Sequence, residues 1–338
     1  IFESTQSLSR NLPLYKIPSH FINGFLTVIF GGSTGVEVST VVATATLGSI
    51  AQQKELVLKN YKIELISAGI AAGITALFCS PIAGILFVWE VIAKKTGKVF
   101  WLCVGLASAV ATFTLWMMKE KSLFAPNVTI WHYHAIPYFI VLGILAGIHS
   151  VYLTKSVLFF KDWFSKFSVS YSKILVGALT LSVLLLCIPA LYGDGYHYMK
   201  SVLLATTMPF SLTLVMGLLG ILILKPVITS ITLASGGDGG VFAPSLFAGA
   251  ALGYLVALLL NTYFDANVIP LNFAIIGMAA VLSASIHAPL TALFVVCGMI
   301  NDYSLMLPIL MICFISKYTA KGLYPYTVYT FTPVHKMN

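Results

Sequence analysis

Apolar runs of helical length recur along this chain from about residue 18 to residue 331, and they constrain its fold more than any other feature. Apolar residues make up 59% of the 338 residues and charged residues only 9%, whereas about a quarter of the residues in a soluble domain are charged. Only helices and closed barrels satisfy their backbone hydrogen bonds inside a bilayer. We therefore expect an all-α polytopic membrane protein whose main contact is the lipid bilayer.

Several of these runs are too short to cross a bilayer alone, because a core about 30 Å thick takes about 20 helical residues. Short helices broken by glycine and proline at membrane depth are typical of transporters and channels, which build a binding site near the midplane. The expected segments are 18–31, 36–51, 63–78, 81–94, 97–118, 136–160, 172–192, 196–206, 209–234, 242–262, 271–284, 288–301, 303–318 and 324–331.

The net charge of +8 comes from 19 Lys and Arg side chains against 11 Asp and Glu side chains. The basic residues lie mostly in short loops or at segment ends. That distribution predicts positive-inside anchoring and contact with lipid headgroups rather than nucleic-acid binding.

An anion-binding pattern stands in the segment 239–246, GGVFAPSL, which ends a glycine-rich loop and begins an apolar helix. Pro244 fits the first turn of a helix, where its missing N–H has no helical partner anyway. Bare N–H groups at the positive end of a helix dipole bind an anion without any basic side chain. Because the surroundings are apolar, the sequence predicts an anion site inside the membrane.

The chain also repeats itself at an offset of 205 to 208 residues. Segments 35–48 and 240–253 both begin and end on glycine, and segments 69–81 and 277–289 both run from a glycine to a proline. The sequence leaves open whether the repeats are parallel or inverted. In an inverted pair, two half-helices would point their N-termini at one site from opposite sides.

Glu37 stands at the opening of a helix, in the part of the first repeat that matches the anion motif. A carboxylate there is stabilised by the same N–H groups and dipole that bind an anion, so it can compete with the anion and leave when protonated. The alternative is a helix-capping glutamate in a loop. Since an acidic side chain in a membrane segment marks function by default, we interpret Glu37 as a proton-sensitive gate.

Four other polar residues indicate a function less specifically than Glu37 does. Glu90, between apolar neighbours, fits a proton relay, a buried structural hydrogen-bonding role or a helix end that reaches water. The hydroxyl of Tyr324 can donate to an anion, although most tyrosines in membrane proteins belong to interfacial belts. Lys225 is expected to snorkel or to pair with a carboxylate, and Asp238 to turn its loop or face water.

An enzyme is the remote alternative. The segment 31–35, GGSTG, fits the pattern of a serine nucleophile at Ser33, and His149 or His287 could serve as its base. That nucleophile elbow needs a strand before the serine, whereas the preceding run has the pattern of a helix. We therefore expect no enzymatic activity, and the sequence shows no convincing metal-ligand spacing.

Together these motifs resemble the CLC family of chloride channels and proton/chloride antiporters over essentially the whole chain. The strongest match is segment 236–246, which looks like the family's G-x-F-x-P anion motif, followed by segments 81–90 and 278–291. The resemblance implies a CLC-type fold of two inverted repeats with broken, tilted helices. It also implies a homodimer with one pore per subunit, chloride as the transported ligand and no cofactor.

The resemblance further implies the roles of individual residues. It assigns anion binding to Val36, Glu37, Val38, Val241, Phe242 and Tyr324. Val241 and Phe242 would supply backbone N–H groups from the second repeat, Tyr324 would supply a hydroxyl, and Glu37 would be the gating glutamate.

Two motifs depart from the family pattern. Segment 35–39, GVEVS, keeps the first glycine and the glutamate of the usual G-K/R-E-G-P motif but loses the basic residue, the second glycine and the proline. The family's serine motif, G-S-G-I-P, is absent, and Ile1 begins just after its expected place. We therefore expect several of the family's helices to precede this sequence, and halide preference is not readable from it.

Val91 bears on the mechanism. Antiporters of the family usually carry a proton-handling glutamate directly after the position of Glu90, whereas channel members have valine, as here. We therefore expect channel-like or weakly coupled chloride conduction, with Glu90 as a candidate proton relay. The alternative is a proton-coupled chloride antiporter.

The expected organisation has three parts. Residues 1–17 form an N-terminal loop or interfacial segment, residues 18–160 a first repeat that is incomplete at its N-terminus, and residues 161–338 a second repeat. No soluble C-terminal domain is expected. We expect the protein to lie in a bacterial inner membrane.

Overall fold

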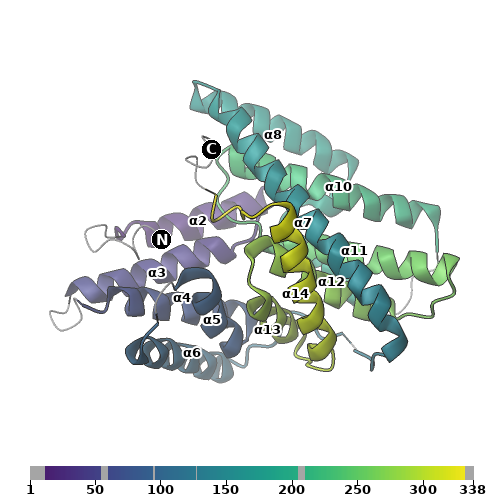
Figure 1. Ribbon diagram of the computed structural model, residues 1–338. Coiled ribbons are helices and arrows are strands. Elements are labelled where there is room, and N and C mark those ends of the chain that lie inside the picture. The colour runs from purple at the N-terminus through teal and green to yellow at the C-terminus, as the bar shows by residue number, and fades with distance from the viewer. Residues whose placement is uncertain (1–11, 55–59, 94–95, 127, 205–209, 332–338) are drawn as a thin grey trace.

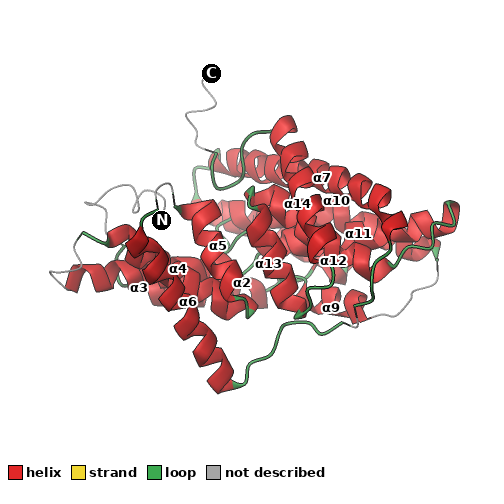
Figure 2. Cartoon of the chain, turned by 60° about the horizontal axis from the view of Figure 1, so that its bottom comes forward, coloured by secondary structure: helices red, strands yellow, loops and turns green. Residues whose placement is uncertain are grey.

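A computed structural model describes residues 12–54, 60–93, 96–126, 128–204 and 210–331, and within these ranges the chain forms thirteen α-helices (Figure 2). Residues 1–11 of the expected N-terminal segment lie outside these ranges. The helices are α2 (Lys16–Ile29), α3 (Glu37–Lys54), α4 (Lys62–Phe78), α5 (Pro81–Phe87), α6 (Lys98–Met118), α7 (Ile136–Ser165), α8 (Ser170–Cys187), α9 (Tyr196–Leu204), α10 (Leu212–Ala234), α11 (Phe242–Tyr263), α12 (Pro270–Ile286), α13 (Pro289–Ile300) and α14 (Met306–Leu323).

The helices form two groups joined across the middle of the molecule (Figure 1). Helices α2 to α6 lie together on one side, and α10 to α12 lie on the other. Helix α7 packs along both α10 and α14, although these elements are far apart in sequence. Helix α11 lies at the centre of the second group and packs most extensively on α12.

Equivalent breaks interrupt the two groups. Helix α4 ends at Cys79, whose φ of 51° is left-handed, and Pro81 begins the next helix. Helix α12 ends at His287, with a φ of 57°, and Pro289 begins the next helix. A left-handed residue ends a helix, and proline at the first helical position starts another. The expected glycine-to-proline repeat is therefore a repeated helix break.

Close helix packing is repeated as well. A side chain at Gly48 would overlap the carbonyl oxygen of Leu65, and one at Gly253 would overlap that of Phe273. Both glycines therefore let a helix backbone approach its neighbour directly, as is typical of helix pairs in membranes. The α3–α4 and α11–α12 pairs thus pack through equivalent contacts.

An antiparallel β-bridge joins the repeats at equivalent residues. The N–H of Gly35 donates to the carbonyl oxygen of Gly240 at 3.0 Å, and the N–H of Gly240 donates back at 3.2 Å. Two residues that exchange both bonds are related by a local two-fold axis. Helices α3 and α11 start near this bridge and run away from it in opposite directions (Figure 1), which favours the inverted arrangement of the repeats.

The expected repeat boundary between residues 160 and 161 falls inside the continuous helix α7 (Ile136–Ser165). The prediction placed it in a polar stretch that the structure shows to be the end of a helix. We propose instead that the repeats are separated after α6, where residues 119–126 and 128–132 form no α-helix. The expected helix over 324–331 is also wrong, because the chain after α14 is extended and then turns at Thr327–Thr330.

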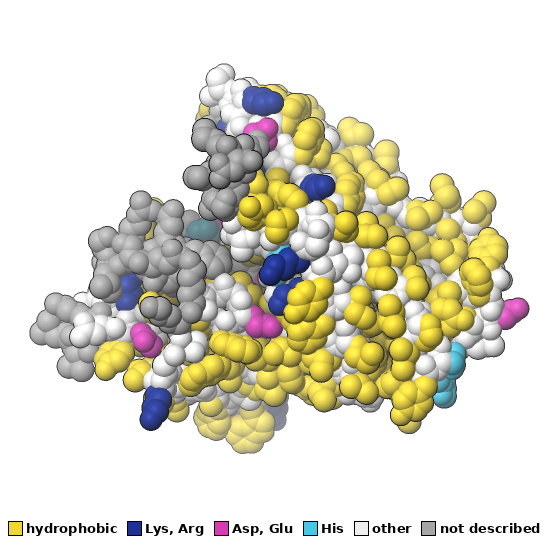
Figure 3. Space-filling view, viewed as in Figure 1, with side chains coloured by type: hydrophobic (Ala, Val, Ile, Leu, Met, Phe, Trp, Pro, Cys, Tyr) yellow, Lys and Arg dark blue, Asp and Glu magenta, His cyan; other side chains and the backbone are white. Residues whose placement is uncertain are grey.

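Five helices of the described chain are long and apolar enough to cross a bilayer. Apolar side chains cover much of the face in Figure 3, and charged side chains are few. Helix α6 exposes Leu102, Leu106 and Trp116, which suits contact with lipid tails. The five helices are the segments Lys98–Met118, Tyr133–Ser165, Leu212–Ala234, Phe242–Tyr263 and Met306–Leu323.

Candidate anion site and gate

The candidate site lies beside the Gly35–Gly240 bridge, which brings the starts of α3 and α11 together. Glu37 is the first residue of α3, and Phe242 is the first residue of α11. The first N–H groups of a helix have no partner within the helix. Two sets of such groups therefore lie close together, as expected of an inverted pair of repeats.

The carboxylate of Glu37 is buried at this point, and the residue is 3% exposed. Its Oε1 atom accepts a hydrogen bond from the hydroxyl of Tyr196 at 2.6 Å. Its Oε2 atom lies over Gly35, where any side chain would overlap it. Among the described residues, Oε2 has no hydrogen-bond partner. The side chain thus folds back toward the bridge and the start of α11.

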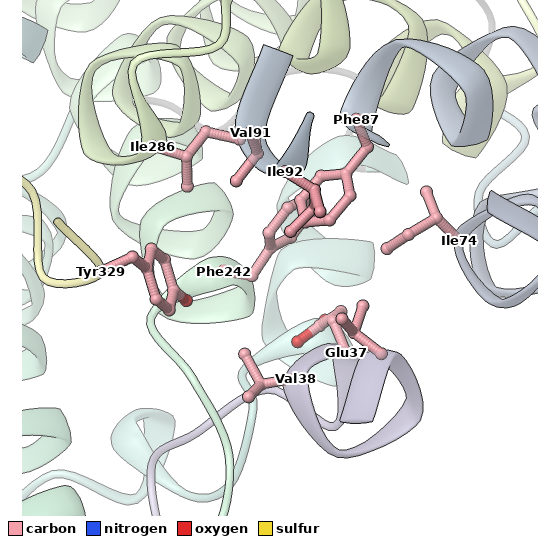
Figure 4. A pocket seen from close by; sticks show the side chains of 10 residues that line it. Glu37, Val38, Ile74, Phe87, Val91, Ile92, Phe242, Ile286 and Tyr329 are labelled. Carbon is pink, nitrogen blue, oxygen red and sulfur yellow. The ribbon is translucent and has the colours of Figure 1, made fainter. Parts of the chain in front are cut away.

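A cavity of about 80 Å³ opens beside Glu37 (Figure 4). A site needs at least about 10–15 Å³ of such volume to hold a water molecule, so the cavity has room for a small ion or a few waters. It extends from Glu37 to Val91. The lining residues are Glu37, Val38, Val41, Ile74, Phe87, Val91, Ile92, Phe242, Ile286 and Tyr329.

The structure brings Tyr329, not Tyr324, to the site. Tyr329 lines the cavity, and its buried hydroxyl has no hydrogen-bond partner among the described residues. Tyr324 does not line the cavity; its ring faces the ammonium group of Lys155 at 5.6 Å and packs beside Tyr326. The turn that Thr327 begins carries the following residues back toward the start of α11. No sequence signal that we used distinguishes these tyrosines.

Two of the other expected anion-binding residues line the same cavity. Val38 and Phe242 line the cavity. Val36 lies in the loop before α3, and its carbonyl oxygen accepts the N–H of Thr40 at 3.0 Å. Val241 is buried and packs in a small apolar cluster. Val38 and Phe242 therefore lie beside Glu37 at the cavity, whereas Val36 and Val241 do not line it.

Glu90 and Val91 point to different places. The turn Val88–Ile92 is π-helical, a local widening that is frequent at functional sites. Glu90 accepts from the N–H of Thr291 at 2.7 Å, the hydroxyl of Thr291 at 2.8 Å and the N–H of Leu290 at 3.3 Å. It therefore caps α13 and does not line the cavity, whereas Val91 does. This geometry favours the structural interpretation of Glu90 over the proton relay.

Sequence reasoning missed Tyr196 and misjudged Lys225. The ammonium group of Lys225 is fully buried and donates to the carbonyl oxygens of Leu191 and Gly193 at 3.1 and 2.8 Å. It neither snorkels nor makes a salt bridge in the described chain. It also lies 4.9 Å from the ring centre of Phe247. Lys225 thus ties the segment before Tyr196 to α10 and α11.

Asp238 pairs with a histidine. Its carboxylate lies 2.7 Å from Nδ1 of His20 on α2. Its backbone N–H donates to the hydroxyl of Thr27, and its carbonyl oxygen accepts from Thr34. Asp238 therefore fixes the glycine-rich loop against the first repeat rather than simply facing water.

The hydrolase alternative does not fit the geometry. Ser33 follows helix α2 rather than a strand, and its hydroxyl bonds that of Thr229 at 2.9 Å. No hydrogen bond joins Ser33 to His149 or His287 among the described residues. The serine thus holds the first repeat against α10.

Comparisons with known proteins identify the family of this chain. A family model described as "Voltage gated chloride channel" (Voltage_CLC) matches residues 1–321. The chain therefore belongs to the CLC family of chloride channels and transporters. It is an integral, multi-pass membrane protein, and the family carries out chloride transport.

The curated relatives are bacterial. The voltage-gated ClC-type chloride channel ClcB of Escherichia coli O9:H4 (strain HS) is 28% identical over 309 residues, which cover 90% of this chain and 72% of ClcB. ClcB of Escherichia coli O17:K52:H18 (strain UMN026 / ExPEC) is 29% identical over 310 residues, with the same coverage.

Two solved structures share the fold. A CLC-type fluoride/proton antiporter matches with a TM-score of 0.81 and 25% identity, over 97% of this chain and 80% of the other. A slow cyanobacterial Cl⁻/H⁺ antiporter matches with a TM-score of 0.78 and 24% identity, over 96% of this chain and 77% of the other. Both support the all-α CLC-type architecture.

Proposed function

We propose that this protein transports chloride through the site between the starts of α3 and α11, with Glu37 as the gate. One observation carries the proposal: a buried carboxylate occupies the point where two helix N-termini converge. In the described chain, Glu37 makes no ion pair with a basic side chain. Helix N-termini attract anions, so the carboxylate stands where a transported anion would bind.

Gating then follows from competition. When Glu37 is charged, its carboxylate fills the anion site. When it is protonated, it loses its attraction to the helix N-termini and can leave, so that chloride takes its place. The N–H groups around Val36–Val38 and Val241–Phe242 would hold the chloride. The hydroxyl of Tyr329 would donate to it, in the role first assigned to Tyr324.

The gate is tested by Glu37→Gln, which mimics the protonated carboxyl group. Chloride efflux from liposomes should become independent of pH, while the matched variant Glu120→Gln, at an exposed glutamate, should keep the wild-type pH dependence. A Glu37→Gln protein that retained the wild-type pH profile would remove Glu37 from the gate.

Weakly coupled or channel-like conduction is supported by the side chains that line the cavity. Val91 lines the cavity, and Glu37 is the one carboxylate among its lining residues. A proton released inward from Glu37 would therefore meet mainly apolar side chains. Glu90 is engaged at α13 instead.

Proton-coupled exchange is the second candidate, and the two solved relatives described as antiporters favour it. The reversal potential of the chloride current in liposomes decides between the modes. A potential that ignores an added pH gradient supports uncoupled conduction, and one that shifts with it supports antiport. Repeating the measurement with fluoride and nitrate gives the anion preference.

We further propose that the protein is a homodimer. Helices α5 and α6 expose large apolar side chains, including Ile82 on α5 and Trp101 and Leu102 on α6. Such a surface suits either lipid or a second copy of the chain. The mass of the detergent-solubilised protein, measured by light scattering, separates a dimer from a monomer.

A further inference from the structure

We propose that Tyr196 latches the gate: its hydroxyl holds the charged Glu37 carboxylate in the anion site, and opening requires that this bond break. Tyr196 is thus a positioning residue for the gate. This inference rests on the proposed function, in which Glu37 is the gate.

The contact itself has the geometry of a strong hydrogen bond. The hydroxyl of Tyr196 donates to Oε1 of Glu37 at 2.6 Å. Bonds from a hydroxyl to a carboxylate fall at about 2.5–2.7 Å and are roughly twice as strong as neutral ones. Among the described residues, no other side chain donates to Glu37. The bond therefore favours the charged, closed form of the gate.

The charges around the pair make this bond more important. The position before the gate, which is basic in the family, is Val36 here. The titratable groups near Glu37 are Tyr196 on α9, Asp194 just before α9 and Tyr329 near the C-terminus. Helices α4 and α11 present apolar Ile74 and Phe242 to the same cavity. The side-chain partner of the carboxylate is thus a neutral hydroxyl, and none of these neighbouring groups is a cation.

Tyr196 is held firmly, whereas Glu37 is not. The N–H of Tyr196 donates to Oδ1 of Asp194 at 3.0 Å, and its ring packs 6.1 Å from that of Phe124. Lys225 fixes the preceding segment through two carbonyl oxygens. Glu37, by contrast, leaves Oε2 without a partner among the described residues. When the bond breaks, we expect the glutamate to move and the tyrosine to stay.

The position of Tyr196 also suits a latch. Its neighbours Gly195 and His197 line a separate, open cavity of about 790 Å³, together with Asp194 and Tyr198. The hydroxyl of Tyr196 reaches in the other direction, to Glu37 in the small apolar cavity. The first turn of α9 therefore separates the open cavity from the gate.

The test is Tyr196→Phe, which removes one oxygen atom and keeps the ring. Chloride efflux from liposomes is measured between pH 4 and pH 9. Without the bond, the charged closed form is less stable. The Glu37 carboxylate then takes up its proton at a higher pH, and the gate opens at that higher pH. Loss of a hydrogen bond to a charged group should change the acid dissociation constant of the Glu37 carboxyl group by a factor of about ten or more. The pH of half-maximal flux should therefore rise by about one unit.

Tyr198→Phe is the matched control, because Tyr198 lies on the same helix and its ring packs against Phe247 rather than bonding Glu37. It should leave the pH profile unchanged. The double variant Glu37→Gln/Tyr196→Phe should behave like Glu37→Gln alone, since the bond has no charged partner left. A merely structural tyrosine would lower the yield of folded protein without moving the pH profile.

The outcomes separate the two hypotheses. If Glu37→Gln removes the pH dependence but Tyr196→Phe leaves the half-maximal pH in place, the latch is wrong and the gate stands. If Glu37→Gln keeps the pH dependence, the proposed gate itself fails. An upward shift in Tyr196→Phe that disappears in the Glu37→Gln background supports both.

Discussion

The starts of α3 and α11 are equivalent in the two repeats but differ in side chains and surroundings. Glu37 and Phe242 occupy equivalent positions, 205 residues apart, beside the bridge. Of the 22 residues of α11, 17 are buried, whereas α3 alternates between buried and partly exposed positions and leaves Leu47 54% exposed. Equivalent helix starts thus carry a carboxylate in one repeat and a packed aromatic ring in the other.

This difference indicates that the two repeats have different roles. The ring of Phe242 stacks on Phe78 at 5.2 Å and packs against Phe87 at 6.4 Å, so the second repeat holds its helix start by packing. Glu37 is held mainly by one hydrogen bond, to Tyr196. A carboxylate held by its charge and by hydrogen bonding can be released by one proton, which a packed ring cannot. We infer that the first repeat supplies the gate and the second its fixed wall.

The largest expected effect concerns the helix crossings. Gly253→Leu forces a side chain into the carbonyl oxygen of Phe273, and α11 is surrounded, so it cannot shift. The cost should exceed the about 1–3 kcal/mol that is typical of overpacking, and size-exclusion chromatography should show loss of the monodisperse peak. Gly48→Leu should lose less stability than Gly253→Leu, because α3 can move toward its exposed side. Equal losses of stability in the two variants would contradict the inference that α3 can shift whereas α11 cannot.

A second comparison concerns the equivalent helix starts. Phe242→Ala should destabilise the protein by about 3–5 kcal/mol, as expected for the loss of a buried aromatic ring. Glu37→Ala should cost much less, because it removes a buried charge that has no cation partner. Thermal unfolding in detergent, followed by light scattering, measures both. A larger loss in Glu37→Ala would show that the carboxylate is a structural element instead of a gate.

A smaller effect is expected at the tyrosines. Tyr329→Phe removes the buried hydroxyl that faces the cavity, and a hydrogen bond to a charged group contributes about 1.5–3 kcal/mol. Chloride affinity, measured by isothermal titration calorimetry, should fall about tenfold or more. Tyr324→Phe should leave it unchanged. The reverse pattern would restore Tyr324 to the site and remove Tyr329.

The smallest effect concerns the caps of the two helices that follow the breaks. Glu90 caps α13 from the first repeat, while the hydroxyl of Ser80 accepts the N–H of Ala83 in α5 at 3.4 Å. Loss of a cap costs about 0.5–2 kcal/mol, so Glu90→Ala and Ser80→Ala should each lower the thermal midpoint slightly. Glu90→Ala should not alter the reversal potential; a change would return Glu90 to the proton path.

Much of the fold could be predicted from the sequence because its signals are local. The predicted segment from 81 to 94 became α5 and the π-helical turn after it, and the predicted segment 242–262 became α11. Left-handed Cys79 and Pro81 set the start of α5. The site was predictable only in part: Glu37 and Phe242 stood in motifs, whereas Tyr196 and Tyr329 did not.

The sequence by itself determined the membrane class, most of the helices and their breaks, because these depend on apolar periodicity, glycine, proline and short motifs. Only the tertiary structure decided that the two helix starts meet, at the Gly35–Gly240 bridge, and which side chains reach the site. Tyr196 bonds Glu37 across 159 residues, and Glu90 reaches Thr291 across 201. Such contacts depend on how helices cross and on the direction in which a turn points a side chain. Neither feature produces a periodic pattern in the sequence.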